Sequence, residues 1–123
     1  MAKVLLADDN AQYRAAFVQA MEALGHDATT IASGEGLIQA ISDEAPDIVF
    51  LDVLMPGGGA ISRLHDIRAA SHDLPVVVIT GNAAVFSSPI VSEGMRGANA
   101  RVSKTISLRE LQDIIDELTA PNS

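Results

Sequence analysis

Short runs of apolar residues alternate along the chain with longer stretches in which apolar residues recur every three to four positions. The runs predict β-strands, and the stretches predict helices with one buried face. Strands are predicted at residues 3–7, 27–31, 47–51, 74–80 and 99–103, with helices at about 11–24, 34–44, 59–70, 89–96 and 108–118. Alternation of this regularity predicts an α/β domain, in which a doubly wound parallel sheet carries helices on both faces.

The ends of the predicted helices carry sequence signals. Gly25 follows the first helix and favours its termination. Ser88 followed by Pro89 is typical of an N-cap and a first helical position, which places a loop at residues 81–87 before the fourth helix. Ser107 and Glu110 form a capping pair at the start of the last helix.

Polar side chains stand where the predicted strands end. Asp8 and Asp9 follow the first strand, and Asp52 follows the third. Thr80 ends the fourth strand, and Lys104 follows the fifth. The carboxyl ends of parallel strands meet at one edge of a sheet, where ligands of such folds bind. We therefore expect all five residues to share one rim.

Carboxylates gathered at one rim need a compensating charge. Like charges about 5 Å apart repel by roughly 3 kcal/mol per pair at an effective dielectric of about 20. A divalent cation removes this repulsion, and ligands that are all oxygen suit Mg2+, Mn2+ or Ca2+. The sequence thus predicts a metal site at Asp8, Asp9 and Asp52, and the alternative for Asp8 or Asp9 is a cap on the helix that follows.

The other rim residues also have plainer interpretations. Asp52 could cap the turn that follows its strand, Lys104 could be a surface lysine, and Thr80 could be an ordinary β-branched strand residue. The three histidines show no spacing typical of a metal site, and surface positions are expected for them.

Composition and charge narrow the class of protein. Hydrophobic residues make up 48% of the chain but aromatic residues only 3%, so an aliphatic core is expected, to which Ile61, Leu64 and Ile67 of the third helix contribute. The 123 residues predict one domain at 1–120 with a short tail at 121–123. A net charge of −8 argues against nucleic acid or an anionic membrane as the main partner. The chain has no cysteine, no apolar run long enough to span a bilayer and no room for a signal peptide before the first strand. We therefore expect a cytoplasmic protein.

In this order, the motifs resemble those of the receiver domain of two-component response regulators, such as the chemotaxis regulators. The matching segments are Leu6-Ala7-Asp8-Asp9-Asn10, Leu51-Asp52-Val53-Leu54-Met55-Pro56-Gly57, Val78-Ile79-Thr80-Gly81, Gly97-Ala98-Asn99-Ala100 and Val102-Ser103-Lys104. The resemblance covers essentially the whole chain. It implies a flavodoxin-like (βα)5 fold with strand order 2-1-3-4-5.

The resemblance also implies a ligand set and an acceptor. Asp52 would accept a phosphoryl group from a sensor histidine kinase or a phosphotransfer protein and form an aspartyl-phosphate. Asp9 would ligate Mg2+ directly and Asp8 mostly through water. Asp52 and the backbone carbonyl of Leu54 would complete the protein ligands, and Mn2+ or Ca2+ could substitute for Mg2+.

Further roles implied by the resemblance concern the phosphoryl group and the signal. Thr80 and Lys104 would contact the phosphoryl oxygens, and Leu54 and Asn82 would flank the water that removes the group. The domain would thus assist its own phosphorylation and dephosphorylation without being an enzyme for another substrate. It would control a downstream protein or an output domain outside this chain, as a monomer or weak homodimer, without contacting nucleic acid or a membrane itself.

Three features depart from the family pattern. Arg101 stands where the family usually has an aromatic residue whose rotamer follows the threonine. Thr105 replaces a proline that commonly follows the lysine in a cis peptide, so the Lys104–Thr105 bond is either trans or held cis under strain. The stretch 80–97 contains Val85 and Phe86, which are candidates either for a partner surface or for folding back under the loop.

Other functions remain as alternatives. A phosphorylation-independent adaptor that keeps the receiver fold is the main one, because Arg101 and Thr105 alter the switch positions. A phosphatase of the haloacid dehalogenase type needs a second acid two residues after the nucleophile, where this chain has Leu54. A flavin carrier of the flavodoxin type binds phosphate in its first loop, where Asp8 and Asp9 would repel it.

Overall fold

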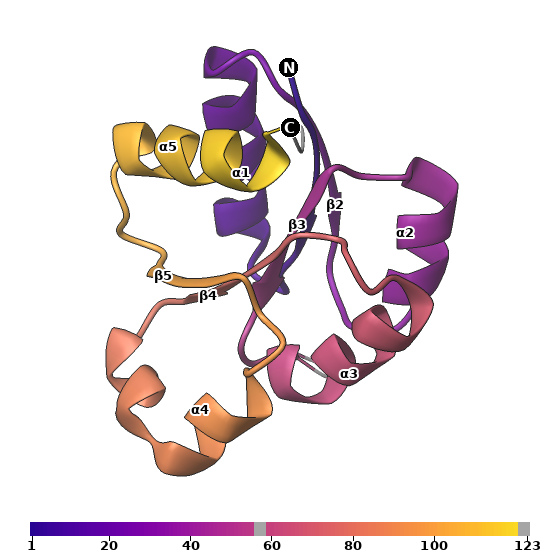
Figure 1. The fold of residues 1–123 in the computed structure, drawn as a ribbon. Helices are drawn as coiled ribbons and strands as arrows, with labels where there is room; N and C mark the ends of the chain where they lie inside the picture. The colour runs from indigo at the N-terminus through magenta and orange to yellow at the C-terminus, as the bar shows by residue number, and fades with distance from the viewer. Residues whose placement is uncertain (56–58, 121–123) are drawn as a thin grey trace.

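The computed structural model describes residues 1–55 and 59–120, and its elements alternate as the sequence predicts (Figure 1). The tail expected at 121–123 lies outside the described residues. The elements are β1 (Lys3–Ala7), α1 (Ala11–Ala23), β2 (Asp27–Ile31), α2 (Leu37–Glu44), β3 (Ile48–Asp52), α3 (Ala60–Ala70), β4 (Val76–Thr80), the 3-10 helix η1 (Ala83–Ser87), α4 (Pro89–Gly94), β5 (Ala100–Ser103) and α5 (Leu108–Thr119). The predicted α/β class is confirmed.

The five strands form one parallel sheet in the order β2-β1-β3-β4-β5, which confirms the order implied by the resemblance. Helices α1 and α5 lie together over one face, and α2 and α3 lie over the other (Figure 1). Successive residues of a strand point to opposite faces. Accordingly Leu5 and Val49 pack in the core cluster under α2 and α3, whereas Leu6 and Phe50 pack in the cluster under α1 and α5.

The three central strands are almost entirely buried, and this sets the environment of the rim. Every residue of β3 and β4 is buried, as is every residue of β1 after Lys3. The edge strands β2 and β5 are partly exposed. Asp8 and Asp52 are therefore carried by strands that run through the core and end beside one another.

Several predicted helix boundaries are confirmed by cap contacts. The Ser107 hydroxyl accepts from the Glu110 backbone N–H at 3.1 Å and lies 3.0 Å from its carboxylate. Ser88 caps α4, and Gly25 follows α1 with a positive φ of 83°. Helix α2 begins three residues later than predicted because Gly36 adopts a φ of 77° directly before Leu37. The loop predicted at 81–87 contains η1, which the sequence did not indicate.

Two burial predictions are wrong. Ile61 is 39% exposed, because it faces the groove between α3 and α4. His26 is buried, where its Nδ1 accepts a hydrogen bond from the Ala2 backbone N–H at 2.9 Å and its Nε2 lies 2.9 Å from Gln112 Oε1. A single histidine thus joins the start of β1 to α5, which spacing along the chain could not reveal.

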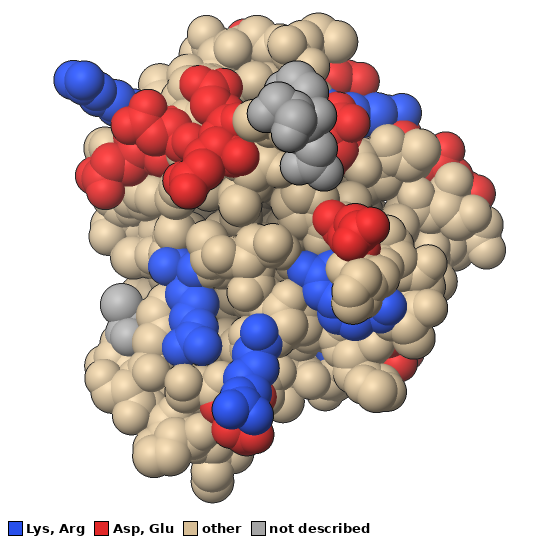
Figure 2. Space-filling model, viewed as in Figure 1, with Lys and Arg blue, Asp and Glu red and all other residues tan. Residues whose placement is uncertain are grey.

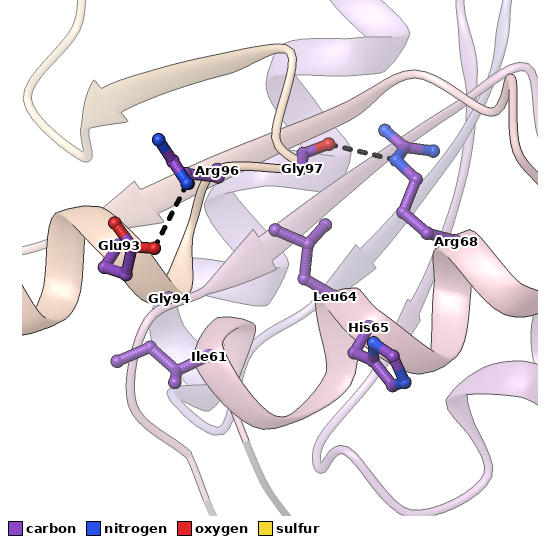
Figure 3. A pocket seen from close by; sticks show the side chains of 8 residues that line it. All are labelled: Ile61, Leu64, His65, Arg68, Glu93, Gly94, Arg96 and Gly97. Carbon is purple, nitrogen blue, oxygen red and sulfur yellow. Dashed lines mark hydrogen bonds and ion pairs between the residues drawn. The ribbon is translucent and has the colours of Figure 1, made fainter.

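The groove between α3 and α4 is spanned by Arg68 (Figure 3). Its guanidinium donates hydrogen bonds to the carbonyls of Leu74 at 2.6 Å and Gly97 at 3.0 Å, and to Asn99 Oδ1 at 2.8 Å. Asn99 Oδ1 also accepts from the backbone N–H of Val76, at the start of β4. Arg68 therefore fixes the turn between α4 and β5 against the end of α3 and helps to set where β5 begins.

No helix in the described part of the chain is both long and apolar enough to cross a bilayer.

Gly59 is required where the segment after β3 enters α3. A Cβ at this position would overlap the backbone carbonyl of Val53. We expect Gly59→Ala to lower the free energy of unfolding by about 2–3 kcal/mol, since the overlap is with backbone that cannot move aside. Urea denaturation measures the loss.

Gly81→Ala is the matched control, because a Cβ there meets no atom closer than Lys104 Cδ at 4.0 Å. Equal stability of the two variants would show that Gly59 is not packed on Val53 as described.

Candidate functional site: a buried acidic cluster

The parallel register of β1 and β3 brings three carboxylates together. Ala7 pairs with Leu51, so the chain reaches Asp8 and Asp52 at the same edge of the sheet. One carboxylate oxygen from each of Asp8, Asp9 and Asp52 lies within 4.8 Å of the others. The structure therefore places the three predicted acids in one cluster.

The turn after β1 fixes Asp8 in a fully buried position. Its backbone N–H donates to the Ile31 carbonyl at 3.0 Å, and its Oδ1 accepts from the Asn10 N–H at 2.9 Å. Arg14 donates to its carbonyl at 2.9 Å. The helix cap itself is Asn10, whose Oδ1 accepts from the Tyr13 N–H at 3.0 Å. The capping role considered for the two acids thus belongs to Asn10.

Lys104 supplies the positive charge of the cluster. Its ammonium lies 2.6 Å from Asp8 Oδ2 and 3.5 Å from Asp52 Oδ2. The backbone places it there, because the Lys104 N–H donates to the carbonyl of Thr80, the last residue of β4, at 2.8 Å. Asp8 Oδ2 is buried and accepts no well-aligned hydrogen bond from a described residue, so its compensation by the ammonium is electrostatic.

Burial and the charges of neighbouring groups shift the pKa values of Asp52 and Lys104. Desolvation and the charge of Asp8 raise the pKa of Asp52, and Lys104 and the Leu54 N–H offset only part of this. Burial alone would lower the pKa of Lys104, but contact with Asp8 and Asp52 outweighs it and raises this pKa. Ionisation of Asp52 is therefore less favourable in the folded protein than in the unfolded chain.

The donor set fits a hard divalent cation. All three side chains offer oxygen, Asp8 Oδ2 accepts no hydrogen bond from the part of the chain that the structure describes, and exposed Asp9 leaves the cluster open on one side. A bound cation would remove the repulsion that raises the pKa of Asp52. The backbone of Leu54, two residues beyond Asp52, lies beside the cluster, since its N–H is bonded to the Asp52 carboxylate.

Thr80 lies at the same rim but is engaged with the following loop. Its buried hydroxyl accepts from the Asn82 N–H at 3.1 Å and donates to the Asn82 carbonyl at 3.3 Å. Among the described residues it makes no hydrogen bond to Asp52. Asn82 in turn caps η1 through its side chain, which accepts from the Ala84 N–H at 3.2 Å.

Arg101 and Thr105, the two residues that depart from the family pattern, make contacts with nearby residues. Arg101 is exposed on β5, and its guanidinium donates to Ser92 Oγ of α4 at 3.2 Å. Thr105 Oγ1 lies 2.8 Å from Ser103 Oγ. Of the two alternatives for the Lys104–Thr105 peptide, the structure has the trans form, as at every described bond.

Residues of the predicted partner surface are only half exposed. Val85 and Phe86 of η1 pack against the core cluster under α2 and α3, which is the second of the two alternatives for them. Ile90 on α4 is instead 81% exposed. The sequence gives no sign of this exposure, because the Ser88–Pro89 helix start indicates a helix but not which side of it Ile90 faces.

The face of the molecule drawn in Figure 2 is divided by charge. Acidic side chains gather over α5 in Figure 2, where Glu110, Asp113, Asp116 and Glu117 are exposed. Basic side chains lie lower in the same view, around α4 and β5. The α3–α4 groove there has a volume of about 220 Å³ and is separate from the carboxylates.

Tyr13 also belongs to the site, although the sequence did not single it out. Its ring centroid lies 4.6 Å from the Lys104 ammonium. Burial, with the charges of Asp8 and Asp52, raises the pKa of Tyr13 to about 12. The signal that could have found it is its place in the first helical turn after the two acids.

Comparison with known proteins gives the family of this fold. The sequence-family model described as the response regulator receiver domain matches residues 4–116 of this chain. The DNA-binding transcriptional regulator NtrC of Azospirillum brasilense is 26% identical over 122 residues, which are 99% of this chain and 25% of that protein. The response regulator receiver protein CpdR of Brucella abortus is 30% identical over 118 residues, which are 96% of this chain and 97% of that protein.

A solved CheY-like receiver domain protein from Methanospirillum hungatei superimposes with a TM-score of 0.84 at 21% identity, over 95% of this chain and 92% of that one. This likeness concerns the fold alone. The chain spans about a quarter of the length of the NtrC relatives but nearly all of CpdR.

The raised pKa of Asp52 has a consequence for stability. An acid whose pKa is raised on folding favours its neutral form there, so its contribution to stability falls as the pH rises above the unfolded value. We expect Asp52→Asn to raise the melting temperature at pH 7 by about 3–5 °C, the shift that about 1 kcal/mol causes in a domain of this size. Asp113→Asn, which removes an exposed carboxylate on α5, should change it little. An unchanged or lower value for Asp52→Asn would contradict the described crowding.

The pKa of Tyr13 can be followed by absorbance, because it is the only tyrosine and the chain has no tryptophan. At pH 11 the native phenol should remain protonated, whereas in urea it should ionise near its ordinary value of about 10. Asp8→Asn should lower the native pKa below about 12, though not to the unfolded value, because burial is the larger cause. A native phenol that titrates as in urea would show that Tyr13 is not enclosed with the acids.

Proposed function

This chain belongs to the response regulator receiver domain family, and we propose that it is a phosphorylation-dependent switch whose acceptor is Asp52. Phosphorylation-based signalling follows from the family, and the choice of acceptor rests on the geometry of the cluster. The observation that carries it is the position of Asp52 at the end of a buried strand, with the Lys104 ammonium 3.5 Å from its carboxylate.

Burial separates the roles of the three acids. Asp8 is fully buried and tied by Oδ1 to the turn, so it cannot approach a phosphorus atom. Asp9 is exposed at the opening of the cluster. Asp52 is intermediate in exposure, with 7% of its surface exposed, and a carboxylate oxygen there can attack a phosphoryl group from solvent.

The reaction forms an acyl phosphate. An oxygen of the Asp52 carboxylate bonds to phosphorus while the bond from phosphorus to the donor, a phosphohistidine of a kinase or phosphotransfer protein, breaks. Lys104 neutralises charge on the phosphoryl oxygens, and Thr80 donates its hydroxyl to them after leaving Asn82. Asp8, Asp9, Asp52 and the Leu54 carbonyl would hold Mg2+, which supplies further positive charge to the transferred group.

Hydrolysis of the acyl phosphate ends the signal. Water must reach phosphorus from the open side of the cluster, which the exposed residues Leu54 and Asn82 would border if they take the roles that the resemblance implies. Leu54 offers no group that can orient or activate this water, whereas the Asn82 amide can bind it. We therefore propose slow self-dephosphorylation with Asn82 as the orienting side chain.

The signal leaves the site through η1, α4 and β5. Thr80 and η1 share Asn82, and Arg101 links β5 to Ser92 of α4. Val85 and Phe86 stay candidates for a partner surface in the phosphorylated state. The partner is a protein target or an output domain, since the relatives include both a long transcriptional regulator and a protein of similar length.

The alternative is a phosphorylation-independent adaptor. It is favoured by Arg101, because an exposed guanidinium held by Ser92 cannot undergo the burial of an aromatic switch residue. Retention of the acids, Thr80 and Lys104 favours the switch.

Incubation with acetyl phosphate and Mg2+ distinguishes the two. We expect a gain of one phosphoryl group in the intact mass, because the donor needs only an aligned carboxylate and charge neutralisation. Asp52→Asn should abolish the gain, Asp113→Asn should keep it, and chelation of Mg2+ should suppress it. A protein that gains no mass at any Mg2+ concentration would favour the adaptor, and a gain retained in Asp52→Asn would move the acceptor elsewhere.

A further inference from the structure

We propose that the Tyr13 ring holds the Lys104 ammonium against Asp8 and Asp52 before phosphorylation, which makes Tyr13 a positioning residue of the site. This inference rests on the function proposed above.

The ammonium of Lys104 is enclosed by three groups. It lies 2.6 Å from Asp8 Oδ2, 3.5 Å from Asp52 Oδ2 and 4.6 Å from the centroid of the Tyr13 ring. A cation within about 6 Å of an aromatic face is attracted by the electron density of the ring. The ring therefore supplies an attraction that is separate from that of the two carboxylates.

The ring itself is held by a row of aromatic contacts that reaches the core. The centroids of Tyr13 and Phe17 are 6.1 Å apart, and Phe17 meets Phe50 edge to face at 5.2 Å. Phe50 is fully buried in β3, two residues before Asp52. The chain has one tyrosine, three phenylalanines and no tryptophan, so three of its four aromatic residues form this row. The backbone of Tyr13 is fixed as well, by its hydrogen bond to the Asn10 cap.

Lys104 needs such a support because its surroundings leave it room. A cavity of about 220 Å³ lies between α1 and α5, and Tyr13 and Lys104 both line it together with apolar side chains. Lysine has a flexible stem with many rotamers, and its contact with Asp8 Oδ2 lacks good hydrogen-bond geometry. Without the ring, the stem could turn toward the cavity and leave the carboxylates uncompensated.

The attraction is of the right strength for a residue that must change partners. Cation–π contacts are weaker than contact between an ammonium and a phosphoryl oxygen. The ring can therefore keep Lys104 beside Asp52 at rest and release it when the phosphoryl group arrives. The Tyr13 hydroxyl makes no hydrogen bond to another described residue, so the ring alone should suffice.

The test compares Tyr13→Phe with Tyr13→Leu in the full chain. Phenylalanine keeps the aromatic face, whereas leucine keeps an apolar side chain without it. We expect the NMR signals of the Lys104 ε-methylene to be shifted upfield by the ring current in wild type and Tyr13→Phe, and to lose this shift in Tyr13→Leu. The initial rate of phosphorylation by acetyl phosphate should fall about 2- to 10-fold in Tyr13→Leu and remain within about 2-fold of wild type in Tyr13→Phe. Circular dichroism and thermal melting verify that both variants fold.

The outcomes separate this inference from the proposed function. Suppose that wild type is phosphorylated, but the Lys104 signals do not change in Tyr13→Leu or the rates of Tyr13→Leu and Tyr13→Phe are equal. Then only the positioning role of Tyr13 is overturned, and the proposed function stands. If Tyr13→Leu does not fold, the test rests on Tyr13→Phe. Loss of the upfield shift or a fall in the phosphorylation rate in Tyr13→Phe overturns the role of the ring, and retention of both supports it. A wild-type protein that accepts no phosphoryl group overturns the proposed function and the positioning role with it.

Discussion

The structure depends on the confinement of like charges at the end of a buried sheet. Asp8 and Asp52 leave β1 and β3, two strands that run through the core, and neither carboxylate can retreat into water without unpairing its strand. Asp9 adds a third carboxylate within 4.8 Å of the others. Such a cluster costs the fold stability unless positive charge is brought to it. Among the described residues Lys104 brings this charge, and in the proposed function its ammonium would shift to accommodate a cation or a phosphoryl group.

The elements around the cluster can be understood as supports for that ammonium. Its backbone is attached to the end of β4, and its side chain crosses from β5 toward the turn after β1. Helix α1 begins immediately beyond this turn under the Asn10 cap, so its first turn presents Tyr13 to Lys104. A site built from three strands and one helix start is rigid where the acids lie and adaptable where the lysine stem borders a cavity.

Much of this arrangement could be predicted, because it depends on regular features. Strand alternation fixes which residues end a strand, and parallel strands end at one edge, so the sequence predicts one rim for Asp8, Asp52, Thr80 and Lys104. Contacts between elements could not be predicted in this way. Neither the ring beside Lys104 nor the burial of His26 follows from spacing, because each depends on how a helix packs on the sheet. Side-chain orientation within short helices, as for Ile90, depends on the same packing.

The effect of the altered switch positions depends on which hydrogen bonds Thr80 loses in the proposed function. In the proposed function its hydroxyl turns to the phosphoryl group, and this breaks both hydrogen bonds with Asn82. Asn82 also caps η1, which leads directly into α4, so the loss changes the start of the segment that carries Val85 and Ile90. An aromatic residue on β5 is not needed for this route. Arg101 instead attaches β5 to α4 through Ser92, and in the proposed function this contact would couple the two elements once the Asn82 contacts are released.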